Sequence, residues 1–575
     1  MMNLISNTWI PIRRKSGEEA RIAPWEVTTR YSDDPIVALA APRPDFNGAL
    51  IQFLIGLLQT TCAPDSPRAW RIWLREPSPP EELHAKFQPV AYAFELDGDG
   101  PRFMQDLTLK LQDVKTSKQK RLKAEETIED EEGQLSIDKL LIDAPGAKTL
   151  KDNKDHFVKR GYVTRLCLCC AASALFTLQT NAPGGGQGNR MGIRGGGPLT
   201  TLVLGKETLW ETLWLNVLEK RLFLSRSGNS ANNKDADHFP WLAPTHTSEK
   251  GEITAPEHIH PDQNFWAMPR RIRLTFSDLP KSSVCDLCSS TSPQMVQSFI
   301  AKNRGVNYKG AFHHPLSPYQ QPRNGEPRAV QAKPSYIGYH YWLGLVENSS
   351  DNAQLGRVDE FEVFPTKSVG YRKTYFSLNA SKNNWLLLIR QHALIARVVE
   401  QYRKPPQEDG RLWAFGYDMD NMKARCWYDA EMPIIFASEE TEVEYKVWIE
   451  NMISVAQQVV AEVRKQVKKA LFRPRTEVKK EALSYLDGRF WSETEAVFYE
   501  CLRSIRDTLN AGEDVTPLLH EWYTTLTRTA YRIFDDASQT GDFNATDPRR
   551  IACAWNDLNK VLAGRKLRVL LGLTA

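Results

Sequence analysis

The sequence lacks any long hydrophobic run. None of its 575 residues belongs to an apolar stretch of the roughly 20 positions that a membrane-crossing helix needs. The first segment, residues 1–14, also lacks the charged start, apolar stretch and small-residue cleavage site of a signal peptide. We therefore expect a cytoplasmic chain with no membrane contact.

The chain also lacks a large excess of charge of one sign. Its 74 basic residues face 70 acidic ones, which leaves a net charge of +4. The overall field is weak, so any contact with nucleic acid has to come from local basic patches. One patch lies within residues 461–481, with eight basic and three acidic residues, and a solvated helix face explains it equally well.

Familiar catalytic motifs are missing. The sequence has no HExxH, GxSxG or Walker motif and no dense carboxylate cluster, and its eleven histidines are scattered. Two histidines, His313 and His314, are adjacent, but no third ligand accompanies them at helical spacing. A structural role for this pair is favoured, and a metal-dependent nuclease that uses it with distant carboxylates stays an alternative.

Cysteine is scarce, with nine residues, yet four of them form two CxxC pairs: Cys167 with Cys170, and Cys285 with Cys288. Two such pairs can wrap four thiolates around a tetrahedral ion and leave no position for substrate. They predict a structural Zn²⁺, with Cys169 as a possible substitute ligand. The others (Cys62, Cys426, Cys501 and Cys553) are expected to be isolated core cysteines.

Three further segments have a composition suited to binding nucleic acid. Residues 181–198 contain eight glycines with Arg190 and Arg194 among them, which favours close backbone approach to a nucleic-acid groove; a flexible loop without a partner stays open. Residues 302–305, Lys-Asn-Arg-Gly, have the same character. Residues 415–425 predict a hairpin whose tip could separate stacked bases.

The length and periodicity predict an α+β chain with two parts. A large mixed domain covers residues 1–437 and includes an apolar helix over 48–61. Apolar spacing then predicts helices over 443–471, 483–509, 515–534 and 548–562, which together favour a four-helix bundle over 438–575.

Several motifs occur in an order that resembles the CasA family, the large subunit of the type I-E CRISPR Cascade complex. They are Asn7-Thr-Trp-Ile-Pro11, Arg102-Phe-Met-Gln-Asp106, Asp155-His-Phe-Val-Lys-Arg160, the cysteine pairs, Ala182-Pro-Gly-Gly-Gly186, Gly192-Ile-Arg-Gly-Gly196, His314-Pro-Leu-Ser-Pro318 and Gly416-Tyr-Asp-Met-Asp-Asn-Met-Lys423. The resemblance spans nearly the whole chain.

The resemblance implies a non-catalytic subunit that works with other Cascade subunits and the guide RNA. It would recognise the protospacer-adjacent motif of duplex DNA from the minor-groove side, start unwinding and recruit a helicase-nuclease, while guide pairing reads the remaining sequence. The residues that match the family's DNA contacts are a glycine loop (Gly184, Gly185 and Gly186), a basic hairpin (Lys302, Asn303 and Arg304), a wedge (Asn421, Met422 and Lys423), and Phe157 in a loop near the motif. A scaffold that binds only proteins is the other class we retain.

Overall fold

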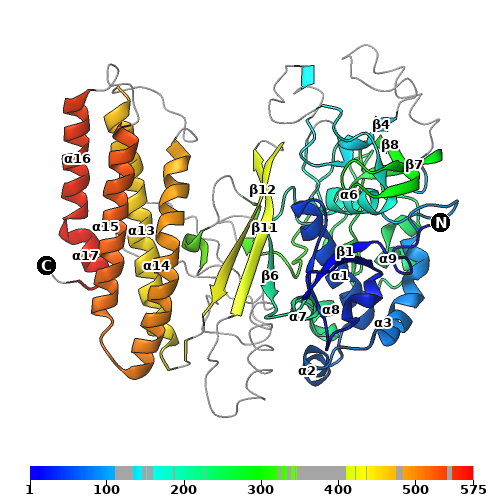
Figure 1. Ribbon diagram of the computed structural model, residues 1–575, viewed down its shortest axis with the longest axis horizontal. Helices are drawn as coiled ribbons and strands as arrows, with labels where there is room; N and C mark the ends of the chain where they lie inside the picture. Colours follow the sequence, from blue (N-terminus) through cyan, green and yellow to red (C-terminus); the bar gives the residue numbers. More distant parts are fainter. Residues whose placement is uncertain are drawn as a thin grey trace.

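The computed structural model of the chain describes most of the 575 residues. The described ranges are 1–109, 134–145, 150–151, 160–185, 188–226, 228–320, 326–332, 338–342, 345, 410–420, 423–435, 437–438, 440–473, 483–539 and 547–573. Within them the chain forms a mixed α and β region followed by long C-terminal helices (Figure 1).

One buried helix organises the N-terminal region. Helix α1 (Pro44–Cys62) begins with a proline in its first turn and is apolar on almost all sides, so it runs through the core rather than along the surface. Phe53 of α1 sits at the centre of an aromatic cluster, where five rings meet it nearly edge-on at centroid distances of 5.3–5.9 Å (Trp9, Phe94, Phe103, Phe176 and Trp266). The helix predicted over 48–61 is confirmed.

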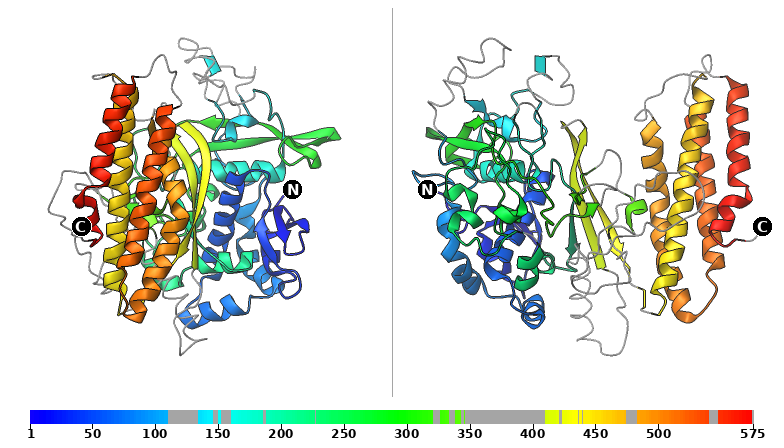
Figure 2. Two further views of the ribbon diagram at one scale, coloured as in Figure 1. Left: turned by 60° about the vertical axis from the view of Figure 1, so that its left-hand side comes forward. Right: turned by 180° about the vertical axis from the view of Figure 1, so that it is seen from behind.

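Small antiparallel sheets surround this core. In the first, β1 (Ile10–Arg14) lies between β2 (Glu19–Ile22) and β3 (Ile36–Leu39). In the second, β8 (Thr291–Lys302) pairs with β4 (Leu135–Ser136), β5 (Leu166–Cys167) and β7 (Arg271–Val284). Strands β7 and β8 form a long hairpin that projects from the N-terminal region (Figure 2).

A third sheet stands between the N-terminal region and the C-terminal helices (Figure 1). Its central strand is β11 (Gly410–Asp420), which pairs with β12 (Lys423–Ile434) and with β6 (Thr200–Leu204). A short pair, β9 (Tyr319–Gln320) and β10 (Arg328–Ala329), completes the described strands.

Short helices fill the connections of the N-terminal region. They are η1 (Pro24–Thr28), α2 (Pro67–Arg75), α3 (Pro80–Phe87), η2 (Gln88–Phe94), η3 (Ile137–Leu140), α6 (Leu168–Asn181), α7 (Leu209–Leu215), α8 (Lys220–Arg226), α9 (Asp235–His238), η4 (Pro240–Leu242), η5 (Pro256–His258), α10 (Gln263–Trp266) and η6 (Tyr339–Tyr341).

The C-terminal helices run side by side (Figures 1 and 2). They are α13 (Glu442–Leu471), α14 (Ser484–Ala511), α15 (Thr516–Gln539) and α16 (Pro548–Leu562), followed by the short α17 (Arg565–Leu570). Their apolar stripes face one another, and Gly512 in the left-handed conformation ends α14. The four predicted helices are therefore present, whereas the domain boundary between residues 437 and 438 stays a prediction. Among the described helices none is both long and apolar enough to cross a membrane.

Helix η6 fastens these helices to the rest of the chain. The ring of Tyr339 is fully buried against Trp491, Phe498 and Trp522, and its hydroxyl lies 2.9 Å from Oγ1 of Thr494. Three residues further on, Trp342 donates its indole N–H to the carbonyl of Pro433 at the end of β12. One short segment thus contacts both the bundle and the third sheet.

Candidate metal centre and nucleic-acid interface

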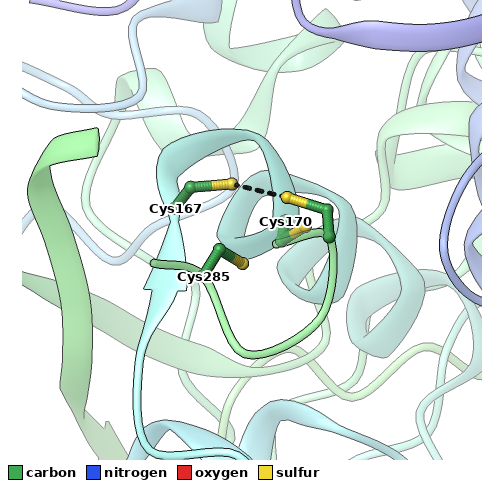
Figure 3. Close-up of side chains that lie close together, drawn as sticks. Cys167, Cys170 and Cys285 are labelled. Carbon is green, nitrogen blue, oxygen red and sulfur yellow. Dashed lines mark hydrogen bonds between the residues drawn. The ribbon is translucent and has the colours of Figure 1, made fainter. Parts of the chain in front are cut away.

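The two cysteine pairs meet although more than a hundred residues separate them. The Sγ atoms of Cys167, Cys170, Cys285 and Cys288 all lie within 4.8 Å of one another, and Cys167 and Cys288 are 3.6 Å apart. Figure 3 shows Cys167, Cys170 and Cys285 pointing toward one another. A zinc–sulfur bond of about 2.3 Å in a tetrahedron requires sulfur atoms about 3.8 Å apart. The four thiols therefore fit a tetrahedral ion, and a metal centre can form here.

Local structure positions each pair. Cys167 ends β5 and precedes the first turn of α6, which brings Cys170 to the same side. Cys285 and Cys288 lie in the turn between β7 and β8, where Ser289 adopts φ of 59°. Asp286 joins the two segments, because one of its carboxylate oxygens accepts hydrogen bonds from the backbone N–H groups of Thr164 and Arg165 at 2.7 and 3.0 Å.

A cation that the sequence did not reveal lies beside the cysteines. Arg21 of β2 donates to Sγ of Cys288 at 3.3 Å, to Sγ of Cys169 at 3.6 Å and to Oγ of Ser290 at 2.6 Å. Hydrogen bonds from the neighbouring thiols of Cys167, Cys170 and Cys285 lower the pKa of Cys288, which favours its thiolate form. Four thiolates around a divalent ion leave net negative charge, and the guanidinium of Arg21 offsets part of it.

The remaining cysteines are not among the four whose sulfur atoms converge. Cys169 faces Arg21 and does not join the four converging sulfur atoms, so the substitute-ligand role considered for it is not needed. Cys62 and Cys501 are buried as expected. Cys426 and Cys553 are exposed, so their prediction as core cysteines was wrong.

The glycine segment, residues 181–198, folds back on itself. A Cβ added to Gly196 would lie 3.0 Å from Cα of Pro183 and 3.1 Å from the backbone N of Gly184, so the two glycine-rich runs touch backbone to backbone. A second close point is a backbone bridge between Gly185 and Asn189. In its described part the segment is a closely packed double loop, in which Gly184 is buried and Gly185 is exposed.

The basic turn that follows β8 lies against one end of this segment. The backbone N–H of Arg304 donates to the carbonyl of Gly188 at 2.8 Å, and a Cβ on Gly188 would lie 2.8 Å from Cγ of Arg304 and 3.4 Å from Cβ of Asn303. Lys302, Asn303 and Arg304 are all exposed, and Arg304 adopts φ of 62°. Two of the predicted DNA-binding segments therefore lie side by side.

The β11–β12 hairpin lies against the other end of the glycine segment. Gly197 has φ of 62°, and a Cβ at this position would come within 2.4 Å of Cγ of Met419 near the hairpin tip. Lys423, the first residue of β12, is exposed. The third predicted segment thus joins the first two.

Helix α1 holds the hairpin. The hydroxyl of Tyr417 donates to the carboxylate of Asp45, which also pairs with Arg43 at 2.9 Å. The ring of Trp427 lies directly over Gly48, where a Cβ would be only 2.6 Å from it. The hairpin is therefore fixed to the central core helix, as a wedge would need to be.

Arginine plays two different parts around the glycine segment. Arg194 is buried and donates to Thr200, Ser317 and Gln52 at 2.6–3.1 Å, and burial lowers its pKa to about 10. It fastens the segment from within, so its expected place in a nucleic-acid groove was wrong. Arg190 is half-buried and donates to Oγ of Ser248 at 2.8 Å.

Arg270 is a second residue that sequence reasoning missed. Its guanidinium donates to the carbonyl of Pro183, next to Gly184, and its backbone N–H and C=O are both held by the side-chain amide of Gln179 at 2.9 and 3.0 Å. Burial lowers its pKa to about 10, and its buried Nε has no hydrogen-bond partner among the described residues. A cation that pairs with no carboxylate in the described part of the chain thus lies under the glycine loop.

The adjacent histidines contribute to packing. Nδ1 of His314 accepts the backbone N–H of Leu316 at 3.0 Å, and its ring meets Phe265 at a centroid distance of 5.2 Å. Neither His313 nor His314 belongs to a cluster of metal-ligating side chains within the described part of the chain. The described residues therefore give no support to the nuclease alternative.

Several predicted residues lie outside the described residues. They are Phe157, Gly186, Asn421 and Met422.

Comparisons with known proteins agree with this architecture. The sequence model of the family described as CRISPR-associated protein Cse1 matches residues 3–533. Among solved structures, that of Thermobifida fusca Cse1 has a TM-score of 0.64 at 15% identity and covers 100% of this chain and 99% of its own. The structure of Thermus thermophilus CasA (Cse1) has a TM-score of 0.61 at 15% identity, with 98% and 99% covered. A chain of a CRISPR RNA-guided surveillance complex has a TM-score of 0.60 at 15% identity, with 98% and 99% covered.

These structural likenesses show that the chain has the fold of the CRISPR-associated Cse1 (CasA) proteins. Since the sequence match covers nearly the whole chain, the protein belongs to the CRISPR-associated protein Cse1 family.

Proposed function

We propose that this protein is the non-catalytic large subunit of a type I-E CRISPR surveillance complex, and that it reads the protospacer-adjacent motif of duplex DNA. The observation that carries the proposal is the meeting of three separate segments. The glycine segment lies against the 302–304 turn at Gly188 and against the β11–β12 hairpin at Gly197. Its assembly partners would be the other subunits and the guide RNA, and a helicase-nuclease would join after unwinding.

The surface chemistry suits the minor groove. This groove offers a degenerate set of acceptors, so backbone groups of a glycine loop and a few cations would give permissive recognition. Gly185 is exposed, and the turn that carries the exposed Lys302 and Arg304 meets the same glycine segment at Gly188. Arg270 adds positive charge beneath the loop that no acidic partner cancels among the described residues. A local basic patch of this kind can attract DNA even when the net charge of the whole chain is small.

A wedge that separates stacked bases has to keep its position against the DNA duplex. Unstacking a base step costs roughly a few kcal/mol, so the inserted tip has to be held by the protein. The contacts of Tyr417 with Asp45 and of Trp427 with Gly48 tie the hairpin to the buried helix α1. We infer that Asn421, Met422 and Lys423 form the inserted tip.

A structural zinc would support the same surface. The four cysteines would hold the ion, and α6 leads from Cys167 directly to Asn181, where the glycine segment begins. The ion would supply four metal–thiolate bonds that fix the start of α6 to the β7–β8 turn. In this role it holds structure and takes no part in a reaction.

The experiment compares binding by the assembled complex. Matched duplexes with and without the adjacent motif are offered to complexes that contain wild-type chain, Gly185→Asp, or Asn421→Ala/Lys423→Ala. We expect the wild type to bind motif-bearing DNA much more tightly and both variants to lose that preference. If the preference survives in both variants, the reading residues lie elsewhere. If the wild type shows no preference across a randomised motif library, the chain is a protein-binding scaffold.

A further inference from the structure

Three metal-ligating side chains gather at a second place, remote in sequence from the cysteines. Nδ1 of His238 lies 2.7 Å from Oδ2 of Asp262, and Nδ1 of His260 lies 3.3 Å from the same oxygen. The potential ligand atoms of all three residues are within 4.8 Å of one another. His260 and Asp262 are buried, and the His238 side chain is one-fifth exposed, at 20%. A buried carboxylate with two imidazoles needs a positive charge close by, which either a protonated His238 or a bound cation supplies.

The hydrogen bonds of His260 leave two electron-rich atoms facing each other. Its Nδ1 accepts the backbone N–H of Asp262 at 3.2 Å, so this nitrogen carries a lone pair and no proton. The same nitrogen stands 3.3 Å from the Asp262 carboxylate oxygen. Two acceptors at this separation repel each other unless a cation lies between them.

The ring nitrogen of His238 that faces away from Asp262 has a hydrogen-bond partner of the kind that metal-bound histidines usually have. Its Nε2 lies 3.0 Å from the amide oxygen Oδ1 of Asn233. Nδ1 shares the proton of a 2.7 Å hydrogen bond with Oδ2 of Asp262, and because Asn233 holds Nε2–H, an ion that displaces the Nδ1 proton would meet the lone pair of this nitrogen. Ligating histidines almost always donate their second N–H in this way, because it fixes the ring and its tautomer.

We propose that His238 and His260, through Nδ1, and Asp262, through a carboxylate oxygen, bind one divalent transition-metal ion of the Zn²⁺ class. Bonds of about 2.0–2.2 Å in a tetrahedron place ligand atoms about 3.4 Å apart, close to the 3.3 Å between His260 and Asp262. The shorter contact of His238 opens as the ion replaces the proton in that hydrogen bond. Imidazole with carboxylate favours zinc, cobalt or nickel over magnesium or calcium.

The position of this site gives the ion a structural task. His238 ends α9, while His260 and Asp262 immediately precede α10, which packs on α1. The irregular chain between them contains Ser248, whose N–H donates to the carbonyl of Arg304 at 3.0 Å, and Thr254, whose N–H donates to that of Asn307 at 2.9 Å. The ion would therefore stabilise the chain that cradles the basic turn. This last link rests on the proposed function, whereas the metal site does not.

The test measures metal in the full chain alone, without DNA, so its result is independent of motif recognition. Protein loaded with Zn²⁺ and freed of excess ion is analysed by mass spectrometry for zinc per chain. We expect two equivalents in the wild type, one in Cys170→Ser and one in Asp262→Asn. His258→Gln is the matched control, because His258 is exposed on the same stretch outside the triad, and it should keep both equivalents.

A second measurement needs no variant and so does not depend on how well one folds. Zinc X-ray absorption of the loaded wild type should show sulfur together with nitrogen or oxygen ligands in similar numbers. A sulfur-only environment, or an Asp262→Asn chain that holds as many zinc equivalents as the wild type, would overturn the second site.

Discussion

Gly197 and Met419 touch so closely that no side chain fits between them. A Cβ on Gly197 would lie 2.4 Å from Cγ and 3.1 Å from Sδ of Met419, and Gly197 itself adopts φ of 62°. The contact joins the C-terminal end of the glycine segment to the tip of a hairpin more than two hundred residues further along the chain. The glycine segment and the proposed wedge hairpin are therefore in direct contact.

This contact makes the first prediction. Gly197→Ala should displace the hairpin tip and remove the preference of the assembled complex for motif-bearing DNA, because the added methyl group overlaps Met419. Overpacking of this kind typically costs about 1–3 kcal/mol of stability. The measurement is the ratio of affinities for duplexes with and without the motif.

Gly195→Ala is the matched control for that variant. Gly195 also has positive φ, 84°, yet a Cβ there would meet only Nε2 of Gln331 at 3.4 Å. The Gly195→Ala variant therefore has the backbone strain without the overlap. Its complex should keep much more of the preference for motif-bearing DNA. Equal losses in both variants would mean that strain alone matters and that the Met419 contact is irrelevant.

Arg270 gives the second prediction. Arg270→Gln should weaken motif preference about tenfold or more, because it removes an uncompensated cation and its hydrogen bond to the Pro183 carbonyl. Arg13→Gln, an exposed arginine on β1, serves as the control and should bind like the wild type. Binding that falls equally in the two variants would point to a general charge effect.

The third prediction concerns metal removal. A strong chelator should strip zinc from the chain and lower its thermal midpoint, since the ion joins the start of α6 to the β7–β8 turn. The Arg21→Gln variant should still bind the ion but release it at a chelator concentration about 10–100-fold lower. Loss of a residue that hydrogen-bonds to a metal ligand usually weakens metal binding by this factor. Zinc release followed with a colorimetric indicator measures this. Arg13→Gln on the adjacent strand is the control, and equal release from both variants would remove Arg21 from the site.

A feature of this chain was predictable from the sequence when it follows from residues close together along the chain. It was not predictable when it depends on tertiary neighbours. The cysteine pairs, helix α1 and the C-terminal helices follow from local spacing, and the structure has them. Arg21 and Arg270 were missed because their roles come from tertiary neighbours, Cys288 in one case and Pro183 in the other. Arg194 was misjudged for the same reason: composition gives a cation near glycines, but only packing shows that it faces Gln52 in the core. A buried arginine and an exposed one have the same sequence signature.

The fourth prediction concerns the attachment of the C-terminal helices. Tyr339→Ala should cost about 3–5 kcal/mol, because it empties a site enclosed by Trp491, Phe498 and Trp522. Tyr339→Phe keeps the ring and removes the hydroxyl that lies 2.9 Å from Oγ1 of Thr494, so it should cost about 1 kcal/mol. Denaturant unfolding followed by tryptophan fluorescence measures both. Tyr92→Ala, at a residue 49% exposed, is the control; a Tyr339→Ala cost no larger than that of this control would show that η6 does not hold the helices.

Crosslinking tests the proposed interface most directly. A photo-crosslinking residue is placed at Lys302, at Lys423 or, as a control, at Arg13, and each chain is assembled with its partner subunits, guide and a matched duplex. We predict crosslinks from positions 302 and 423 to nucleotides of the adjacent motif or the base pair beside it, which disappear when the motif is scrambled, and none from position 13. Crosslinks that ignore the motif, or that form only from position 13, would contradict the claim that the 302–304 turn and the β11–β12 hairpin read DNA.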